Sequence, residues 1–140
     1  MSDIISLHFD VDGEDFTRAG EASYGVKRTL KQLGINPEAV RKVAIALFEG
    51  EINMVIHAEG GVIDIEIDNN QIKMILRDKG PGIPDIEKAM QEGFSTASDD
   101  VRSLGFGAGM GLPNMKKYTD SMDIQTELGI GTTVTMVVNL

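Results

Sequence analysis

Four glycines alternate with other residues directly before a predicted helix: Gly105, Gly107, Gly109 and Gly111. Such a backbone presents several N–H groups together with the positive end of a helix dipole, an arrangement that binds an oligophosphate. The spacing is not that of the Rossmann motif, because Met110 and Leu112 occupy positions where that motif needs glycine, and the Gly-Lys pair of a P-loop is absent. The segment is therefore either a phosphate-binding loop of another kind or a flexible linker.

A second group of candidates follows a predicted strand, in the sequence Asp78-Lys79-Gly80-Pro81-Gly82. An aspartate at a strand end can accept a hydrogen bond from an exocyclic amine such as that of adenine, and Gly80 and Gly82 leave room for a flat ring. Thr132, before the last predicted strand, could add a water-mediated contact to the same base. Taken alone, each of these stretches is more often an ordinary turn.

A carboxylate and a carboxamide share one face of a predicted helix. Glu49 and Asn53 are four residues apart, so they lie one turn apart on a narrow stripe that also holds Lys42 and His57. The rest of this helix is apolar in nearly every direction, which predicts that it is buried. Carrying the charge of Glu49 into such a helix is costly unless it is paired or faces a wet cavity, so the stripe lines a pocket or forms a polar surface strip. The helix pattern does not explain Glu51, which lies in the apolar arc.

The elements that position these residues follow from the periodicity of the apolar side chains. Period two predicts strands, and a 3.6-residue period with suitable end residues predicts helices. The expected elements are a strand at Ile5–Phe9 with an exit turn at Val11–Gly13, a helix at Glu14–Leu33, a helix from Pro37 to about His57 with Asn36 as N-cap, a hairpin of Val62–Ile67 and Ile72–Leu76, a helix at Leu112–Tyr118, and strands at Met122–Ile124 and Thr133–Val138.

This order of elements predicts an α+β fold. Consecutive paired strands with helices between them favour a two-layer α/β sandwich, with one mostly antiparallel sheet and the helices on one face. The other face of the sheet should then be covered weakly or by a partner. A length of 140 residues suits a single domain over residues 1–140.

Composition excludes several classes of function. The chain has no Cys, which excludes disulfides, thiolate zinc sites and cysteine nucleophiles. Its net charge of -9 disfavours binding to nucleic acid. The longest apolar run, Val43–Phe48, is far below the ~18 residues that span a bilayer, and the first ten residues lack the basic start of a signal peptide. We therefore expect no membrane segment and a cytoplasmic protein.

Together, the motifs resemble a known family. Glu49-x-x-x-Asn53, Asp78-x-Gly80-x-Gly82, Gly107-x-Gly109-x-Gly111 and Gly131-Thr132 occur in this order. The set resembles the ATP-binding (Bergerat) fold shared by gyrase, Hsp90, histidine kinases and MutL, and it extends over essentially the whole chain. The small size and the stretches at 85–96 and 131–136 are similar to the stand-alone serine/threonine kinases of anti-sigma regulation, with most likeness to the stress-signalling switch type.

The resemblance implies a role for each motif. Glu49 would be the base that polarises an attacking hydroxyl or water, and Asn53 would hold Mg²⁺ at the phosphates. Asp78 would bind adenine, assisted by Thr132 and with room made by Gly80 and Gly82. The residues implied at the phosphates of ATP are Gly107, Gly109, Met110, Gly111 and Leu112.

The resemblance also implies a lid over the nucleotide, and the sequence departs from the family at two positions. The implied lid is mobile and covers roughly Glu92–Ala108. Phe48 stands where such kinases usually carry a small residue, and Ile56 where histidine kinases commonly carry a lysine. Phosphate charge must then be met by Mg²⁺, by backbone or by a lid cation such as Arg102.

Two classes of function follow from the resemblance. The first is an ATP-dependent kinase that phosphorylates a serine or threonine of a small antagonist protein of the STAS type. The second is a module that captures a sigma factor or an antagonist according to its ATP state, without significant phosphotransfer. A detached histidine-kinase domain is a weaker third, and a homodimer is possible in either case.

Overall fold

The computed structural model describes residues 4–13, 19–57, 60–80, 82, 90 and 111–140. In this part of the chain the elements are β1 (Ile5–Asp12), α1 (Glu21–Gln32), α2 (Pro37–His57), β2 (Gly60–Ile67), β3 (Gln71–Asp78), α5 (Gly111–Lys117), β4 (Ser121–Glu127) and β5 (Gly131–Asn139). Their order is the one that the sequence predicts. The bounds also agree within a few residues, except at the start of α1.

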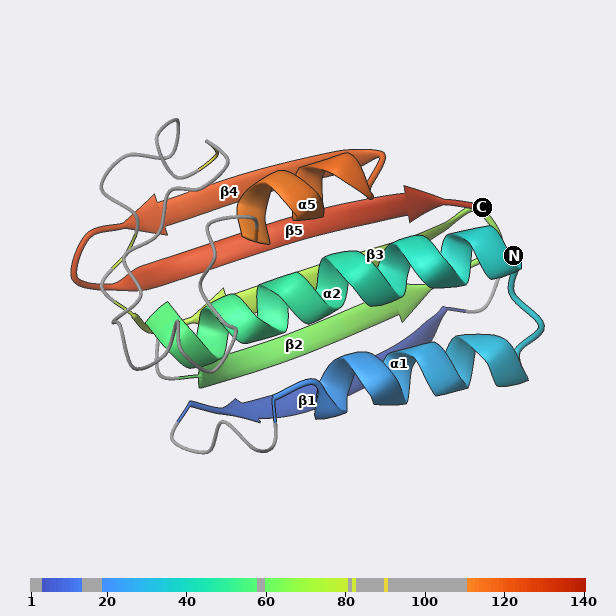
Figure 1. The fold of residues 1–140 in the computed structure, drawn as a ribbon, viewed down its shortest axis with the longest axis horizontal. Helices are drawn as coiled ribbons and strands as arrows, with labels where there is room; N and C mark the ends of the chain where they lie inside the picture. The colour runs from blue at the N-terminus through green and yellow to red at the C-terminus, as the bar shows by residue number, and fades with distance from the viewer. Residues whose placement is uncertain (1–3, 14–18, 58–59, 81, 83–89, 91–110) are drawn as a thin grey trace.

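The five strands form one sheet in the order β1-β2-β3-β5-β4. Every neighbouring pair is antiparallel, including β3 with β5, which are joined through α5 and β4. Figure 1 shows α1, α2 and α5 on one face of this sheet. The predicted α+β fold with two layers is therefore confirmed.

The core lies between the sheet and the helices. Because side chains alternate between the two faces of a strand, every second residue of the central strands points at the helix layer. The fully or almost fully buried strand residues are Ile63, Ile65, Ile67, Ile72, Met74, Leu76, Val134, Met136 and Val138. Val26 and Leu30 of α1 and Val43 and Leu47 of α2 complete this core from the helix side. The period-two pattern in the sequence is the pattern that buries one face of the sheet.

Helix α2 begins as the sequence predicts. The Asn36 side-chain oxygen accepts the Glu38 N–H at 2.8 Å, and Pro37 supplies the fixed backbone angle of the first helical position. The helix runs to His57. It is not buried on every side, however, because the Phe48 side chain remains 41% exposed.

Helix α1 starts seven residues later than predicted, at Glu21 rather than Glu14. Ala19 and Gly20 form a turn, and Gly20 has a φ of 100°, which ends any helical pattern before it. Residues 14–18 lie outside the described part of the chain. The expected turn after the first strand is also corrected, because Val11 and Asp12 still pair with β2.

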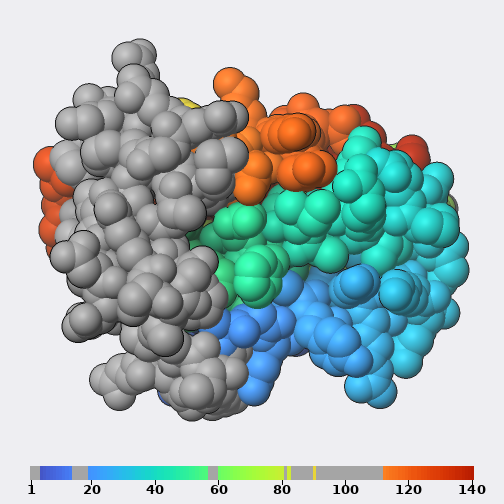
Figure 2. Space-filling model, in the orientation of Figure 1, coloured from blue at the N-terminus to red at the C-terminus, as the bar shows by residue number. Residues whose placement is uncertain are grey.

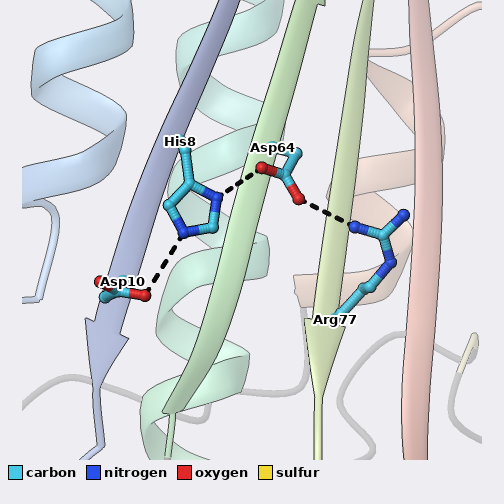
Figure 3. Close-up of polar contacts among 4 residues, drawn as sticks. All are labelled: His8, Asp10, Asp64 and Arg77. Atoms are coloured by element: carbon cyan, nitrogen blue, oxygen red, sulfur yellow. Dashed lines mark hydrogen bonds and ion pairs between the residues drawn. The ribbon is translucent and has the colours of Figure 1, made fainter.

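The sheet face opposite the helices is polar. His8 of β1, Asp64 of β2 and Arg77 of β3 lie side by side across three strands (Figure 3). His8 Nδ1 is 2.5 Å from one Asp64 carboxylate oxygen, and Arg77 donates to the other at 2.8 Å. Nothing in the described residues covers these half-exposed or exposed side chains, and whether a partner does remains an expectation.

Among the described residues, the helices are all too short or too polar to cross a membrane.

Candidate functional site

Those predicted site residues that the structure describes gather at one end of the molecule. The C-terminal half of α2, the end of β3 and the start of β5 all lie at the left of Figure 1. Residues that are far apart in the sequence meet there, because antiparallel pairing of β3 with β5 places Arg77 opposite Thr133. Asp78, which comes directly after Arg77, and Thr132, which comes directly before Thr133, therefore lie next to each other at the strand ends.

Glu49 and Asn53 lie on the face of α2 that contacts α5. The Asn114 amide donates to Oε1 of Glu49 at 3.4 Å, and the Asn53 amide lies 3.8 Å from the sulfur of Met115. Both α2 side chains are half-buried. Within the described ranges, no donor reaches Oε2 of Glu49 or Oδ1 of Asn53, so one oxygen of each remains as an acceptor.

Gly50 allows α2 to lie close to its neighbours at this point. A Cβ atom built on Gly50 would lie 2.4 Å from Leu76 Cδ2 and 3.2 Å from Met115 Cε. Any larger residue would push α2 away from β3 or from α5. Gly50 belongs to none of the sequence motifs, although a glycine within a run of good helix formers is a signal of close packing.

Asp78 is held by the backbone around it. Its Oδ1 accepts the N–H of Gly80 at 2.9 Å and the N–H of Thr132 at 3.1 Å. In the part of the chain that is described, Oδ2 receives no hydrogen bond, so it is available to a ligand donor. The Thr132 hydroxyl is 2.9 Å from the hydroxyl of Thr126. The two hydrogen bonds to Oδ1 thus fix the orientation of the carboxylate and leave Oδ2 as an acceptor.

Gly131 brings the start of β5 against the end of β3. Its φ is 152°, and a Cβ there would lie 2.2 Å from the Asp78 carbonyl oxygen, so only glycine fits. Gly82 lies against the backbone of Glu127, the last residue of β4, and of Leu128 in the turn that follows. The sequence predicted that Asp78, Gly80, Gly82 and Thr132 act on one ligand group, and the structure does bring these residues together.

The remaining predicted residues are only partly placed. Gly111 is the first residue of α5, and Leu112 is half-buried against the core. Gly107, Gly109 and Met110 lie outside the described residues, as do Arg102 and the predicted lid at 92–108. His57 is the last residue of α2. The phosphate-binding role of the glycine motif therefore stays a prediction.

Glu51, which the helix pattern could not explain, has a clear structural partner. It is 2% exposed, and its carboxylate accepts the backbone N–H groups of Gly20, Ala22 and Ser23 at 2.9, 3.2 and 2.9 Å. The Ser23 hydroxyl also donates to it at 2.7 Å. Glu51 therefore caps the N-terminus of α1 from the neighbouring helix, where the cap residue Gly20 has no side chain to do so.

The donor set fits a magnesium nucleotide. A carboxamide oxygen such as Oδ1 of Asn53 is a hard ligand of the kind that Mg²⁺ prefers, and Mg²⁺ usually takes its other ligands from phosphates and water. The described residues hold no group of three or more His, Asp or Glu side chains that could bind a metal ion. The spare acceptor on Asp78 suits the exocyclic amine of adenine.

Comparison with known proteins gives a family and several relatives. A model described as "Histidine kinase-, DNA gyrase B-, and HSP90-like ATPase" matches residues 37–140. The chain is 34% identical over 112 residues to the serine/threonine-protein kinase RsbT of Bacillus subtilis (strain 168), covering 77% of this chain and 78% of that protein. It is also 34% identical over 128 residues to the anti-sigma F factor of Thermoanaerobacter sp. (strain X514), covering 88% of this chain and 82% of that protein.

Solved structures share the fold. The crystal structure of the RsbU and RsbW domains of Rv1364c from Mycobacterium tuberculosis aligns with a TM-score of 0.66 at 16% identity over 96% of this chain, which spans 32% of that one. The mycobacterial sensor histidine kinase MprB aligns with a TM-score of 0.55 at 17% identity, over 96% of this chain and 97% of that one. With the family model matching from α2 to the C-terminal strand, and the same fold in these structures, the chain belongs to the histidine kinase-, DNA gyrase B- and HSP90-like ATPase family.

Proposed function

We propose that this protein binds Mg-ATP and transfers the γ-phosphoryl group to a serine or threonine hydroxyl of a small antagonist protein of the STAS type. The observation that carries the proposal is the pair on α2, where Glu49 and Asn53 lie one turn apart and each keeps one oxygen free within the described structure. Similarity to a protein named serine/threonine-protein kinase and to one named anti-sigma F factor supports the choice of reaction and partner.

Asp78 is the proposed adenine-binding residue. Because the Gly80 and Thr132 N–H groups fix its Oδ1, Oδ2 can accept the exocyclic amine of the base without reorganising the strand ends. Thr132 contributes through its backbone and through a hydroxyl that is already hydrogen-bonded to Thr126. Gly80 and Gly82 keep side chains away from the space that the ring would occupy.

Phosphate and metal binding fall to the other two motifs. Asn53 would hold Mg²⁺ through its carboxamide oxygen, and the residues proposed at the phosphates are Gly107, Gly109, Met110, Gly111 and Leu112. When bound, ATP supplies the phosphoryl group and Mg²⁺ neutralises charge on the phosphate oxygens. The chain itself supplies orientation and an acceptor for a proton.

Glu49 is the proposed general base. The attacking hydroxyl must lose a proton as its oxygen bonds to the γ-phosphorus and the bond from that phosphorus to the departing ADP breaks. Within the described residues, Oε2 of Glu49 is the free carboxylate oxygen beside Asn53, which would hold Mg²⁺. A carboxylate one helical turn from the metal ligand can accept that proton and also orient the hydroxyl.

We further propose that residues 1–140 act as one ATPase unit in the cytoplasm, where its ATP and protein partner would be found.

The second candidate is ATP-dependent capture of a sigma factor or an antagonist without significant phosphotransfer. The likeness to a protein named anti-sigma F factor favours it. It needs the same nucleotide site but no base at Glu49. A homodimer is compatible with both functions and remains a prediction.

Transfer of labelled phosphate separates the two candidates. The parent protein, Glu49→Gln and Glu38→Gln are incubated with γ-labelled ATP and candidate antagonist proteins of the STAS type, and Mg-ATP affinity is measured in parallel. Glu38→Gln is the matched control, because Glu38 is an exposed carboxylate on the same helix that pairs with Arg41. We expect all three to bind Mg-ATP and only Glu49→Gln to lose transfer, by about 100-fold or more.

Two outcomes would contradict this account. Transfer by Glu49→Gln at the parent's rate would remove Glu49 as the base. Binding of Mg-ATP by the parent without transfer to such a partner would favour the capture module.

A further inference from the structure

Two adjacent residues of α5 contact the two proposed functional residues of α2. Asn114 donates to Oε1 of Glu49 at 3.4 Å, and the sulfur of Met115 lies 3.8 Å from the amide nitrogen of Asn53. In both pairs the α5 residue engages one polar atom and leaves the other polar atom of its partner open. Figure 2 shows α5, in orange, lying directly against α2.

Asn114 is held in a fixed place. The next residue, Met115, is 1% exposed and anchors α5 in the core beside Gly50. The Thr119 hydroxyl donates to the Met115 carbonyl at 2.7 Å and secures the end of the helix. At the same end, the Arg41 guanidinium lies 5.6 Å from the centre of the Tyr118 ring and ties α5 to α2. These contacts fix the position of α5 and so the position from which the Asn114 amide donates to Glu49.

The chemistry of an amide suits this position. Its N–H group stabilises the charged carboxylate by donating to one oxygen, and unlike a histidine or a carboxyl group it does not compete for the proton. With Oε1 engaged, the carboxylate is restrained so that Oε2 is the oxygen left to meet a hydroxyl. A separation of 3.4 Å is long for such a bond, as is common in enzymes without substrate.

We propose that Asn114 is a positioning residue that orients the carboxylate of Glu49 for proton acceptance. The inference rests on the kinase function proposed above. It adds a residue outside the four sequence motifs and makes α5 a support for both Glu49 and Asn53, in addition to its place directly after the glycine motif.

Conservative substitutions of Asn114, with a control on the exposed side of α5, test this role. Asn114→Asp keeps the shape of asparagine but removes the donor and adds a second carboxylate next to Glu49. Asn114→Gln keeps the amide on a longer chain, and Lys116→Ala on the exposed side of α5 is the control. We expect Asn114→Asp to lower kcat for phosphotransfer about tenfold or more, the effect of losing one hydrogen bond to a charged group, with KM for ATP and Kd for Mg-ATP changed less than about twofold.

The conservative variant distinguishes positioning from a merely structural role. Asn114→Gln should recover part of the lost kcat, whereas Lys116→Ala should match the parent. If Asn114→Asp raises Kd for Mg-ATP by as much as it lowers kcat, Asn114 binds nucleotide and the inference is wrong. A parent-like kcat in Asn114→Asp would also overturn it.

A measurement without turnover separates failure of this inference from failure of the proposed function. Unfolding in urea of Glu49→Ala, Asn114→Ala and the double variant gives a thermodynamic cycle. We expect non-additive changes, because each substitution removes the same contact. Additive changes would overturn the inference whatever the transfer assay shows. Non-additive changes in a protein that transfers no label would refute the kinase function but confirm the interaction between Asn114 and Glu49.

Discussion

Two carboxylates of α2 that are two residues apart have different tasks because they face different neighbours. Positions two apart on a helix point about 200° away from each other. Glu49 faces α5 and keeps Oε2 free in the described structure, whereas both oxygens of Glu51 accept hydrogen bonds from the start of α1. Glu49 is therefore the carboxylate we propose for proton transfer, and Glu51 supports the fold.

His8 makes the stability of the protein depend on pH. The hydrogen bond to Asp64, with the charges of Asp64 and Asp10, raises the pKa of His8 above its ordinary value of 6.5. A pKa raised by folding adds stability that is complete below about pH 6.5 and is lost as the pH rises through the raised value. We expect the urea midpoint of the parent to fall as the pH rises above about 6.5, and this fall to shrink in His8→Gln.

The same titration has an internal control. His57 is the other of the chain's 2 histidines and is kept in His8→Gln, so any slope that remains belongs to other groups. Added salt should weaken the effect, because the His8 side chain is exposed. An identical pH slope in the parent and in His8→Gln would show that the contact with Asp64 contributes nothing to stability.

At the scale of elements, α1 depends on α2 for its start. Three backbone N–H groups and the Ser23 hydroxyl all donate to Glu51, which is almost fully buried. Glu51→Ala leaves these donors without an acceptor, so we expect it to lower the free energy of unfolding by about 3 kcal/mol or more. Glu51→Gln should cost less because its amide oxygen still accepts.

Urea denaturation measures this effect, with Glu38→Ala as control. Glu38 is an exposed carboxylate of the same helix, so its loss should lower the free energy of unfolding far less than the loss of Glu51. Equal losses for Glu51→Ala and Glu38→Ala would refute the capping role.

At this scale, the sequence predicts a helix end or a turn well when the residues that determine it lie close together in the chain. The cap at Asn36 and the turn at Asp68, whose carboxylate accepts the N–H groups of Asn70 and Gln71, are decided within four residues, and the predicted helix start and hairpin were right. The start of α1 was wrong because its cap, Glu51, lies about 30 residues further along the chain. The contact between Asn114 and Glu49 spans 65 residues and leaves no periodic trace in the sequence.

Over the whole molecule, the sheet order explains why Asp78 and Thr132, which belong to separate motifs, meet. Placing β5 beside β3 sets Thr132 against Asp78, and Gly50 lets α2 lie on Leu76 at the same end of the sheet. The motif order in the sequence predicted a shared site. The distances within it depend on strand pairing and on close packing at Gly50, which the motifs alone do not encode.

Calorimetric titration of the parent and of Asp78→Asn with Mg-ATP tests whether these elements form a site for Mg-ATP. We predict that the parent binds with a Kd in the micromolar range, which corresponds to a binding free energy of about -8 kcal/mol. Asp78→Asn should bind at least about tenfold more weakly. The amide keeps the size of Asp78 but removes the charge and one acceptor that the base needs. Equal affinities, or no binding by the parent at millimolar Mg-ATP, would contradict the account.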